Sequence, residues 1–269
     1  MKRAAIFGMG TIGTSLAIDW MQRAPSGWVL DSVCSRRDCF PALRQLLSEN
    51  VAITDDLGEV LAQSPDAVVE TAGHASALQF GAEILRNGSD LYLLSSGILA
   101  DPKTYDDFLC AADIGQSKII IPSGALAGFD GLMALSRARP ATVTYRSTKP
   151  ANAWRDTPAE DQFDLDALDK PTVFFRGSAR EAALMFPKNA NLAASVALSG
   201  VGFEQTKVEL VADPNGVGNV AELEARISSC TLKVQMTSQP EPLNPKSSAV
   251  VRSSVFAALE RQENRLRLG

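Results

Sequence analysis

The sequence predicts an α/β protein in two parts: a parallel sheet with crossover helices, then an α+β part whose sheet is mostly antiparallel. Two observations support this prediction. Over roughly the first 120 residues, short apolar strands alternate with segments of helical periodicity, as in a parallel sheet. From about residue 125 onward, strand-like segments follow one another with few helices between them, which favours antiparallel pairing.

The first part reads as a succession of βα units. Parallel strands of this kind place ligands at their carboxyl ends. We expect strands at Ala4–Phe7, Trp28–Ser35, Val51–Thr54, Ala67–Glu70, Asp90–Ser95 and Lys118–Ile121, and helices at Thr14–Arg23, Phe40–Ser48, Leu57–Gln63, Ser76–Asn87 and Pro102–Ile114.

The second part carries mainly strand periodicity. We expect a first domain over residues 1–124, with residues 244–269 packing back onto it, and a second domain over residues 125–243. A small substrate is expected to lie in the cleft between the two domains. The expected strands are Thr142–Thr148, Thr172–Arg176, Thr206–Ala212, Asn219–Ser228 and Thr231–Thr237, and the expected helices are Gly128–Ala138, a long one at Ala190–Gly200, and Ser247–Glu260.

Composition excludes several classes of protein. The net charge of -5 and the scattered Lys and Arg residues give no basic footprint for nucleic acid. No apolar stretch approaches the roughly 20 residues that a membrane span needs, and a strand beginning at about residue 3 leaves no room for a signal peptide. The four cysteines have no CxxC spacing, so we expect reduced thiols, no metal site and a cytoplasmic protein.

A glycine-rich turn joins the first strand to the first helix. The run Gly8-Met9-Gly10-Thr11-Ile12-Gly13 has the GxGxxG spacing that holds a dinucleotide pyrophosphate at a helix N-terminus. In such a turn, Gly8 allows the tight bend, Gly10 lets the backbone approach the phosphates, and Gly13 lets helix and strand pack closely. The spacing alone is a weak signal. With a strand before it and a helix after it, it predicts a Rossmann domain.

The end of the second strand bears on cofactor choice. Domains specific for NAD usually place Asp or Glu there to bind the ribose 2'-hydroxyl, whereas this chain reads Ser35-Arg36-Arg37. Arginine favours a 2'-phosphate, so we expect NADP to be preferred over NAD, with Arg36 as the phosphate partner. An exposed basic turn is the alternative. Asp38 can still serve NAD if the strand ends later than expected.

Two segments of the second half are candidate anion sites. Lys188, Asn189 and Asn191 bring a cation and two amides to the start of a helix, which suits a dicarboxylate. Lys246 with Ser247, at the expected start of the last helix, is the second candidate. For each segment the structural alternative is a capped helix beside a solvated lysine.

Several ordered sequence blocks are spread over essentially the whole chain. They are Glu70-Thr71-Ala72-Gly73-His74-Ala75, Pro122-Ser123-Gly124-Ala125-Leu126-Ala127-Gly128-Phe129-Asp130, Lys149-Pro150-Ala151-Asn152-Ala153-Trp154, Gly177-Ser178-Ala179-Arg180-Glu181-Ala182, Phe186-Pro187-Lys188-Asn189-Ala190-Asn191-Leu192-Ala193-Ala194, Ala212-Asp213-Pro214 and Asn244-Pro245-Lys246-Ser247-Ser248. Together these blocks resemble the L-aspartate dehydrogenase family. That resemblance implies a nicotinamide-dependent homodimer that converts L-aspartate, through iminosuccinate, to oxaloacetate and ammonia, with residues 1–124 as the dinucleotide-binding Rossmann domain and residues 125–243 as the substrate and dimerisation domain.

The resemblance also implies roles for particular residues. The positions of Ala125 and Asn191 contact the cofactor in the family, and we place Ala72, Gly73 and Ser96 in the same site. His74, the only histidine, resembles a position that lines the cofactor or substrate cleft, so any imidazole chemistry must use it. A hydrogen-bonded structural histidine is the alternative.

One position departs from the family pattern. Members usually read Asn-x-His where this chain reads Asn219-Val220-Ala221, and that histidine is the family's catalytic acid and base. Alanine cannot titrate. Three explanations remain open: a natural member with altered chemistry, a substitute such as His74 or a water molecule, or a deliberate replacement.

Two further functions stay open alongside aspartate dehydrogenation. A homologue that binds nucleotide and dicarboxylate without turnover would explain the missing histidine. A dehydrogenase for another amino or imino acid is the other alternative, because fold and cofactor site do not fix the substrate.

Overall fold

The chain forms two compact units. The first contains residues 1–95, 102–122 and the C-terminal segment from residue 252, and the second contains residues 96–101 and 123–251. Residues 96–101 group with the second unit although they follow a strand of the first. The computed structural model describes residues 1–138, 141–187, 189–241, 244–248 and 250–266, and only the backbone of residues 240–241 and 244–247.

The first unit is built on a six-stranded sheet in the order β3-β2-β1-β4-β5-β6, and each neighbouring pair is parallel. This confirms the predicted parallel sheet. The register aligns Phe7 of β1 with Cys34 of β2 and Glu70 of β4, so these strands end at one edge. The strands are β1 (Lys2–Phe7), β2 (Trp28–Cys34), β3 (Ala52–Thr54), β4 (Ala67–Glu70), β5 (Asp90–Leu93) and β6 (Ile119–Ile120).

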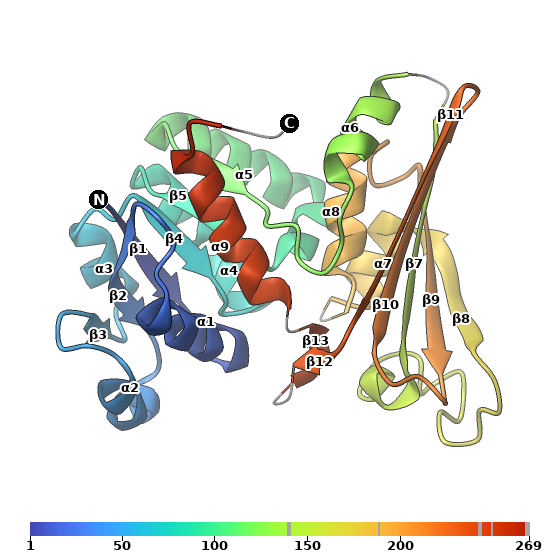
Figure 1. The fold of residues 1–269 in the computed structure, drawn as a ribbon, viewed down its shortest axis with the longest axis horizontal. Helices are drawn as coiled ribbons and strands as arrows, with labels where there is room; N and C mark the ends of the chain where they lie inside the picture. The colour runs from blue at the N-terminus through green and yellow to red at the C-terminus, as the bar shows by residue number, and fades with distance from the viewer. Residues whose placement is uncertain (139–140, 188, 242–243, 249, 267–269) are drawn as a thin grey trace. The chain divides into compact units, whose positions relative to one another are not determined.

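Helices cover both faces of this sheet (Figure 1). Ile6 belongs to a buried cluster with Leu16 of α1, whereas Phe7 meets Phe80 of α4 edge-on at 5.6 Å between ring centroids. Successive side chains of a strand point to opposite faces, so α1 and α4 lie on opposite sides. The helices are α1 (Thr11–Gln22), α2 (Phe40–Leu46), α3 (Leu57–Ala62), α4 (His74–Arg86) and α5 (Pro102–Gly115), with a short 3-10 turn η1 at Arg37–Cys39.

The last helix, α9 (Val250–Glu263), packs on the first unit. Phe256 meets Trp20 edge-on at 5.3 Å between centroids, and the indole N–H of Trp28 donates to the Leu259 carbonyl at 3.1 Å. The expected helix start at residue 247 is wrong. The chain instead forms a short hairpin, β12 (Pro240–Glu241) with β13 (Asn244–Ser248), since the residue before a proline favours extended backbone.

The second unit contains a five-stranded sheet in the order β11-β10-β7-β9-β8. Only β7 and β9 pair in parallel, so the sheet is mostly antiparallel, as predicted. The strands are β7 (Thr142–Pro150), β8 (Thr172–Ser178), β9 (Thr206–Asp213), β10 (Asn219–Ile227) and β11 (Cys230–Ser238).

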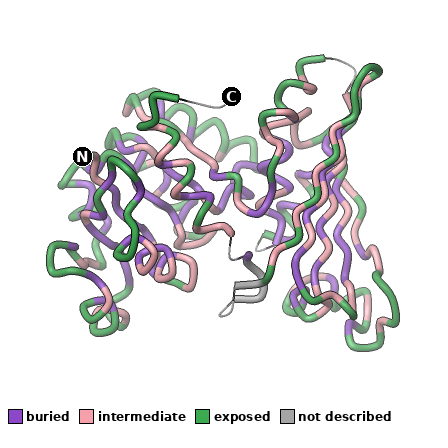
Figure 2. The backbone as a smooth tube through the Cα atoms, in the orientation of Figure 1, coloured by how far each residue is buried: buried purple, intermediate pink, exposed green. Residues whose placement is uncertain are grey.

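One face of this sheet is buried under helices. Burial alternates residue by residue along β7 and β10, and Figure 2 shows the same alternation of buried and partly exposed backbone. Leu210 and Leu223 of the sheet join Phe186 and Val196 in one buried cluster. The covering helices are α6 (Phe129–Arg137), α7 (Ala179–Met185) and α8 (Asn191–Ser199).

Helix α7 was not expected, and the expected long helix is only the nine residues of α8. A capping box starts α7: the Glu181 N–H donates to the Ser178 hydroxyl at 3.2 Å, and the Ser178 N–H donates to the Glu181 carboxylate at 2.7 Å. The Ser-x-x-Glu spacing is the sequence signal that would have predicted this helix start.

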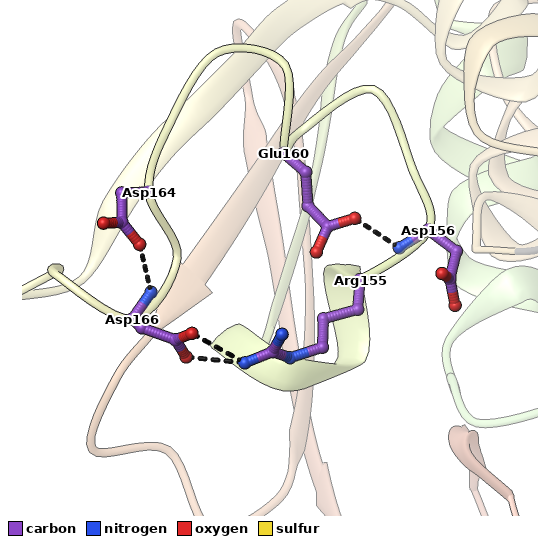
Figure 3. Close-up of polar contacts among 5 residues, drawn as sticks. All are labelled: Arg155, Asp156, Glu160, Asp164 and Asp166. Carbon is purple, nitrogen blue, oxygen red and sulfur yellow. Dashed lines mark hydrogen bonds and ion pairs between the residues drawn. The ribbon is translucent and has the colours of Figure 1, made fainter.

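A long acidic connection follows the short turn η3 (Ala151–Trp154) and leads to β8. Arg155, at its start, closes most of this connection into a loop, because its guanidinium contacts both carboxylate oxygens of Asp166 at 2.6 and 2.8 Å (Figure 3). The Asp156 N–H donates to Glu160 at 2.8 Å, and the Asp166 N–H donates to Asp164 at 3.1 Å. Local contacts therefore order this loop.

Two general features bear on the class of protein. Among the described residues, no helix is long and apolar enough to cross a membrane. The four cysteines are all free thiols, two of them, Cys110 and Cys230, on the surface.

Burial of the Cys34 thiol makes the free energy of unfolding depend on pH in the alkaline range. Burial, reinforced by Asp55 and Asp56, raises the pKa of the Cys34 thiol to about 11. The unfolded thiol ionises near pH 8.5, so the unfolded state loses this proton first and stability falls between about pH 9 and pH 11. Thermal melts should show this fall, and it should be shallower in Cys34→Ala. The exposed-thiol control Cys230→Ala should keep the parent slope; equal slopes in all three proteins would contradict the assignment.

Candidate functional site

The turn between β1 and α1 lies at the carboxyl edge of the first sheet. Gly8 has a φ of +101°, a conformation open mainly to glycine, and its N–H donates to the Cys34 carbonyl at 2.9 Å. The chain then enters α1 at Thr11, with the Gly10 carbonyl accepting from the Thr14 N–H at 2.9 Å. The turn is therefore tied to the second strand and to the first helix.

Two of the three glycines of the motif are packed against protein. A Cβ on Gly8 would lie 2.6 Å from the Cβ of Ala72. A Cβ on Gly13 would lie 2.6 Å from the Thr71 hydroxyl and still closer to the Gly8 carbonyl oxygen. No real Cβ makes such contacts. Gly8 and Gly13 thus let the turn, the first helix and the β4–α4 loop pack together.

Gly10 differs from its two neighbours in the motif. A Cβ on Gly10 would meet no protein atom within 4 Å, and the same holds for Gly73, whose φ is +92°. Helix α1 begins beside Gly10, and the first N–H groups of a helix lack intrahelical acceptors. An anion can therefore approach backbone donors at the open side of this turn, and a dinucleotide pyrophosphate fits it.

The end of β2 carries the residues expected to choose the cofactor. Ser35 is buried, whereas Arg36 is 83% exposed along its side chain and lies 3.6 Å from the Asp38 carboxylate. An ion pair this exposed contributes little, so Arg36 is able to turn toward a ligand. Arg37 is engaged more closely, with its Nε 2.6 Å from Asp55, and this contact lowers the pKa of the Asp55 carboxyl.

His74 is the first residue of α4 rather than part of a loop, because the helix starts two residues earlier than expected. It is half-buried and follows Gly73, which caps the helix. Its place in the first unit is the edge that also carries the glycine turn.

Asn191 and Ser96 come together in the second unit. The Asn191 side-chain oxygen accepts from the Gly97 N–H at 3.0 Å, and its carbonyl accepts from the Ser96 hydroxyl at 3.0 Å. Ser195 adds a hydroxyl 3.3 Å from that of Ser96. The first turn of α8 thus holds the 3-10 segment η2 (Ser96–Ala100). Ala125, the other proposed cofactor contact of this unit, is buried.

Asn189 is used inside the second unit. Its side-chain N–H donates to the Ala153 carbonyl at 3.2 Å, and its buried side-chain oxygen has no hydrogen-bond partner among the described residues. Lys188 lies outside the described residues, as do the side chains of Lys246 and Ser247. The backbone of Lys246 and Ser247 belongs to β13, which corrects their expected place at a helix start.

Ala221 lies where the buried face of the second sheet changes from apolar to polar. It pairs with Ser147 of β7, which is also buried. On one side of this pair the face continues with Leu223. On the other side it continues with Asn219 and Lys149, both 8% exposed. Buried polar groups are expensive in a core, so this end of the sheet face has the character of a site.

Two buried charged residues, one in each unit, were missed from the sequence. Lys149 is a buried cation whose ammonium lies 5.3 Å from the centre of the Trp154 ring. Glu70 is fully buried and accepts hydrogen bonds at the end of β4. The sequence does carry a signal for Glu70. An acidic residue at the end of the otherwise apolar strand Ala67–Val69 needs hydrogen-bond partners there, so it is a candidate site residue.

The described part of the chain contains no group of three or more His, Cys, Asp or Glu side chains that is placed to hold a metal ion.

Comparison with known proteins decides the family. Residues 130–262 match the family described as "Aspartate dehydrogenase, C-terminal", and residues 8–122 match "Homoserine dehydrogenase, NAD binding domain". An L-aspartate dehydrogenase of Bordetella bronchiseptica is 37% identical over 268 residues, 99% of both chains. The chain belongs to the L-aspartate dehydrogenase family.

Further L-aspartate dehydrogenases are similar to this chain. The Ralstonia pickettii protein is 43% identical over 194 residues, covering 72% of this chain and 73% of that one. The solved structure of aspartate dehydrogenase from Thermotoga maritima superposes with a TM-score of 0.72 at 23% identity, covering both chains completely. That structure confirms the fold class, and the match to residues 8–122 identifies the first unit as an NAD-binding domain.

Two glycine variants separate folding from cofactor binding in this dehydrogenase. Gly13→Ala should destabilise the protein by about 3 kcal/mol, because the new Cβ overlaps the Gly8 carbonyl and the Thr71 hydroxyl. Gly10→Ala should change stability by less than about 1 kcal/mol, since its Cβ enters open space at a helix N-cap.

Gly10→Ala should instead weaken cofactor binding, although it changes stability little. Fluorescence titration with NADPH should show about a tenfold loss of affinity in Gly10→Ala, because we expect the phosphates to approach the backbone where the new methyl group would lie. Parental affinity in Gly10→Ala would contradict the placement of the cofactor.

Proposed function

We propose that this protein is an NAD(P)-dependent dehydrogenase that interconverts L-aspartate and iminosuccinate, which hydrolyses to oxaloacetate and ammonia. The observation that carries the proposal is the similarity to named L-aspartate dehydrogenases along 99% of the chain, together with a glycine turn open at Gly10. The substrate is a dicarboxylic amino acid.

The residues of the first unit bind and orient the cofactor. Backbone N–H groups at the start of α1 receive the pyrophosphate beside Gly10, while Gly73 leaves a second stretch of backbone accessible. The bound nicotinamide supplies a hydride acceptor for the Cα–H of the amino acid, or a hydride donor for the imine. Residues of the chain then have to hold the substrate and move its protons.

Proton transfer is where this chain differs from the family pattern. Ala221 offers no titratable group, so it cannot deprotonate the substrate ammonium or the water that attacks the imine. Loss of a general acid or base costs typically about 10²- to 10⁴-fold in rate. We propose slow oxidative deamination and better-preserved reduction of a preformed imine. His74 is the substitute base if one acts.

Substrate carboxylates require cations in the second unit. We retain Lys188, Asn189, Asn191, Lys246 and Ser247 as proposed substrate contacts, and Asn191, Ser96 and Ala125 as proposed cofactor contacts. Lys149 supports the proposal by adding a buried positive charge on the sheet face that carries Ala221. A homodimer in the cytoplasm remains a prediction.

Ala221 also favours a second candidate function. A homologue that binds dinucleotide and dicarboxylate without turnover keeps the glycine turn and needs no acid or base. It differs from the enzyme in one respect: it binds NADPH yet gives no change in the absorbance of reduced nicotinamide with any amino or imino acid.

Restoring an imidazole tests the role of position 221. Ala221→His should raise kcat for aspartate oxidation about 10- to 100-fold and add a pH dependence centred near pH 6.5, because imidazole titrates there. Ala221→Asn, similar in size and unable to titrate, is the matched control and should give no gain. Rates should be measured with aspartate and with oxaloacetate plus ammonia. An Ala221→His protein no faster than the parent would refute the idea that this position limits catalysis.

Arg36 is proposed to select NADP through the 2'-phosphate. In Arg36→Ala, the Kd for NADPH should rise about tenfold while the Kd for NADH stays unchanged, as expected for one lost charged hydrogen bond. Arg37→Ala is the control, because Arg37 is already held by Asp55 at 2.6 Å. If the NADPH to NADH affinity ratio is the same in Arg36→Ala and the parent, Arg36 does not read the phosphate.

A further inference from the structure

Glu70 is a fully buried carboxylate at the carboxyl end of β4. One of its oxygens accepts from the Gly73 N–H at 2.8 Å and from the Ser95 hydroxyl at 3.1 Å. Its other oxygen accepts from the Ser95 N–H at 2.9 Å. Glu70 thus joins the loop after β4 to the chain just after β5.

The donors around Glu70 specify a carboxylate rather than an amide. Two of them are backbone N–H groups, which cannot reverse their role, and they bond to different oxygens. Glutamine has one oxygen and one NH₂ group, so in either orientation one backbone N–H would face another N–H.

The loop held by Glu70 forms one wall of the glycine turn. Gly73 caps α4, and Ala72 lies within 2.6 Å of the place where a Gly8 side chain would start. The Thr71 hydroxyl donates to the Phe7 carbonyl at 3.3 Å and to that of Gly8. A shift of this loop would therefore move the turn that binds the pyrophosphate.

We propose that Glu70 is a positioning residue of the dinucleotide site. Its three hydrogen bonds fix Gly73 and Ser95. They thereby hold the accessible backbone at Gly73 in place relative to the open side of Gly10. Glu70 does this without touching the cofactor. The proposal rests on dinucleotide binding by the first unit and not on which amino acid is the substrate.

The structure offers a matched pair of serines for the test. Ser95 and Ser89 are both buried and flank the same strand, β5, at opposite ends. The Ser95 hydroxyl bonds Glu70 at the carboxyl edge, whereas the Ser89 hydroxyl bonds the Pro65 carbonyl at 2.7 Å at the amino edge. Ser95→Ala and Ser89→Ala remove the same hydroxyl group from two buried positions, so a purely structural effect would be similar in both.

Dissociation constants for NADPH and NADP⁺ should be measured by fluorescence and calorimetry, alongside melting temperatures, for the parent, Glu70→Gln, Ser95→Ala and Ser89→Ala. We expect both constants to rise about tenfold in Glu70→Gln and about threefold in Ser95→Ala, since one buried charged and one neutral hydrogen bond are lost respectively. Ser89→Ala should bind both nucleotides like the parent, even though its melting temperature falls as far as that of Ser95→Ala.

Two results would overturn the proposal. One is equal affinity in Ser95→Ala and Ser89→Ala, which also decides the matter if Glu70→Gln does not fold. The other is parental affinity in a folded Glu70→Gln protein. A parent that binds neither nucleotide would instead contradict the proposed function itself, so the two failures are distinguishable.

Discussion

The close approach of three backbone segments at the carboxyl edge of the first sheet is the constraint on which the functional site depends. Gly8 and Gly13 can carry no side chain because Ala72, Thr71 and the turn itself already fill that space. Interiors packed to this density transmit displacements instead of absorbing them. The same packing leaves Gly10 facing open space, so the geometry that closes the turn against the protein also presents it to a ligand.

Local patterns predicted most of the fold because they act through nearest neighbours. Alternating burial in β7 and β10 follows from two-residue periodicity, and β4 was found to the residue because apolar residues end at a charged one. The failures have particular causes. Helix α7 starts at a capping box that lies inside one of the family sequence blocks. The last helix begins only after β13, which pairs with β12 a few residues upstream.

The candidate site was less predictable than the fold, because its residues meet through tertiary contacts. The glycine motif could be predicted from the sequence, because its strand, turn and helix are contiguous in the chain. The contact of Asn191 with Gly97 and that of Glu70 with Ser95 join residues far apart in sequence, and no periodicity encodes them. Lys149 belongs to one of the family sequence blocks, and the alternating burial along β7 places its side chain on the buried face of the sheet. The significance of Ala221 came from the family resemblance, and its setting among Ser147, Asn219 and Lys149 came from the sheet register.

The proposed dinucleotide site lies where the glycine turn and the β4–α4 loop both leave their backbone open. Hydrogen–deuterium exchange of the full chain, measured with and without NADPH, tests this placement. Amides of residues 10–14 and 72–76 should exchange more slowly when NADPH is bound, because the cofactor covers donors that otherwise face solvent. Unchanged exchange in both segments under saturating NADPH would contradict the account.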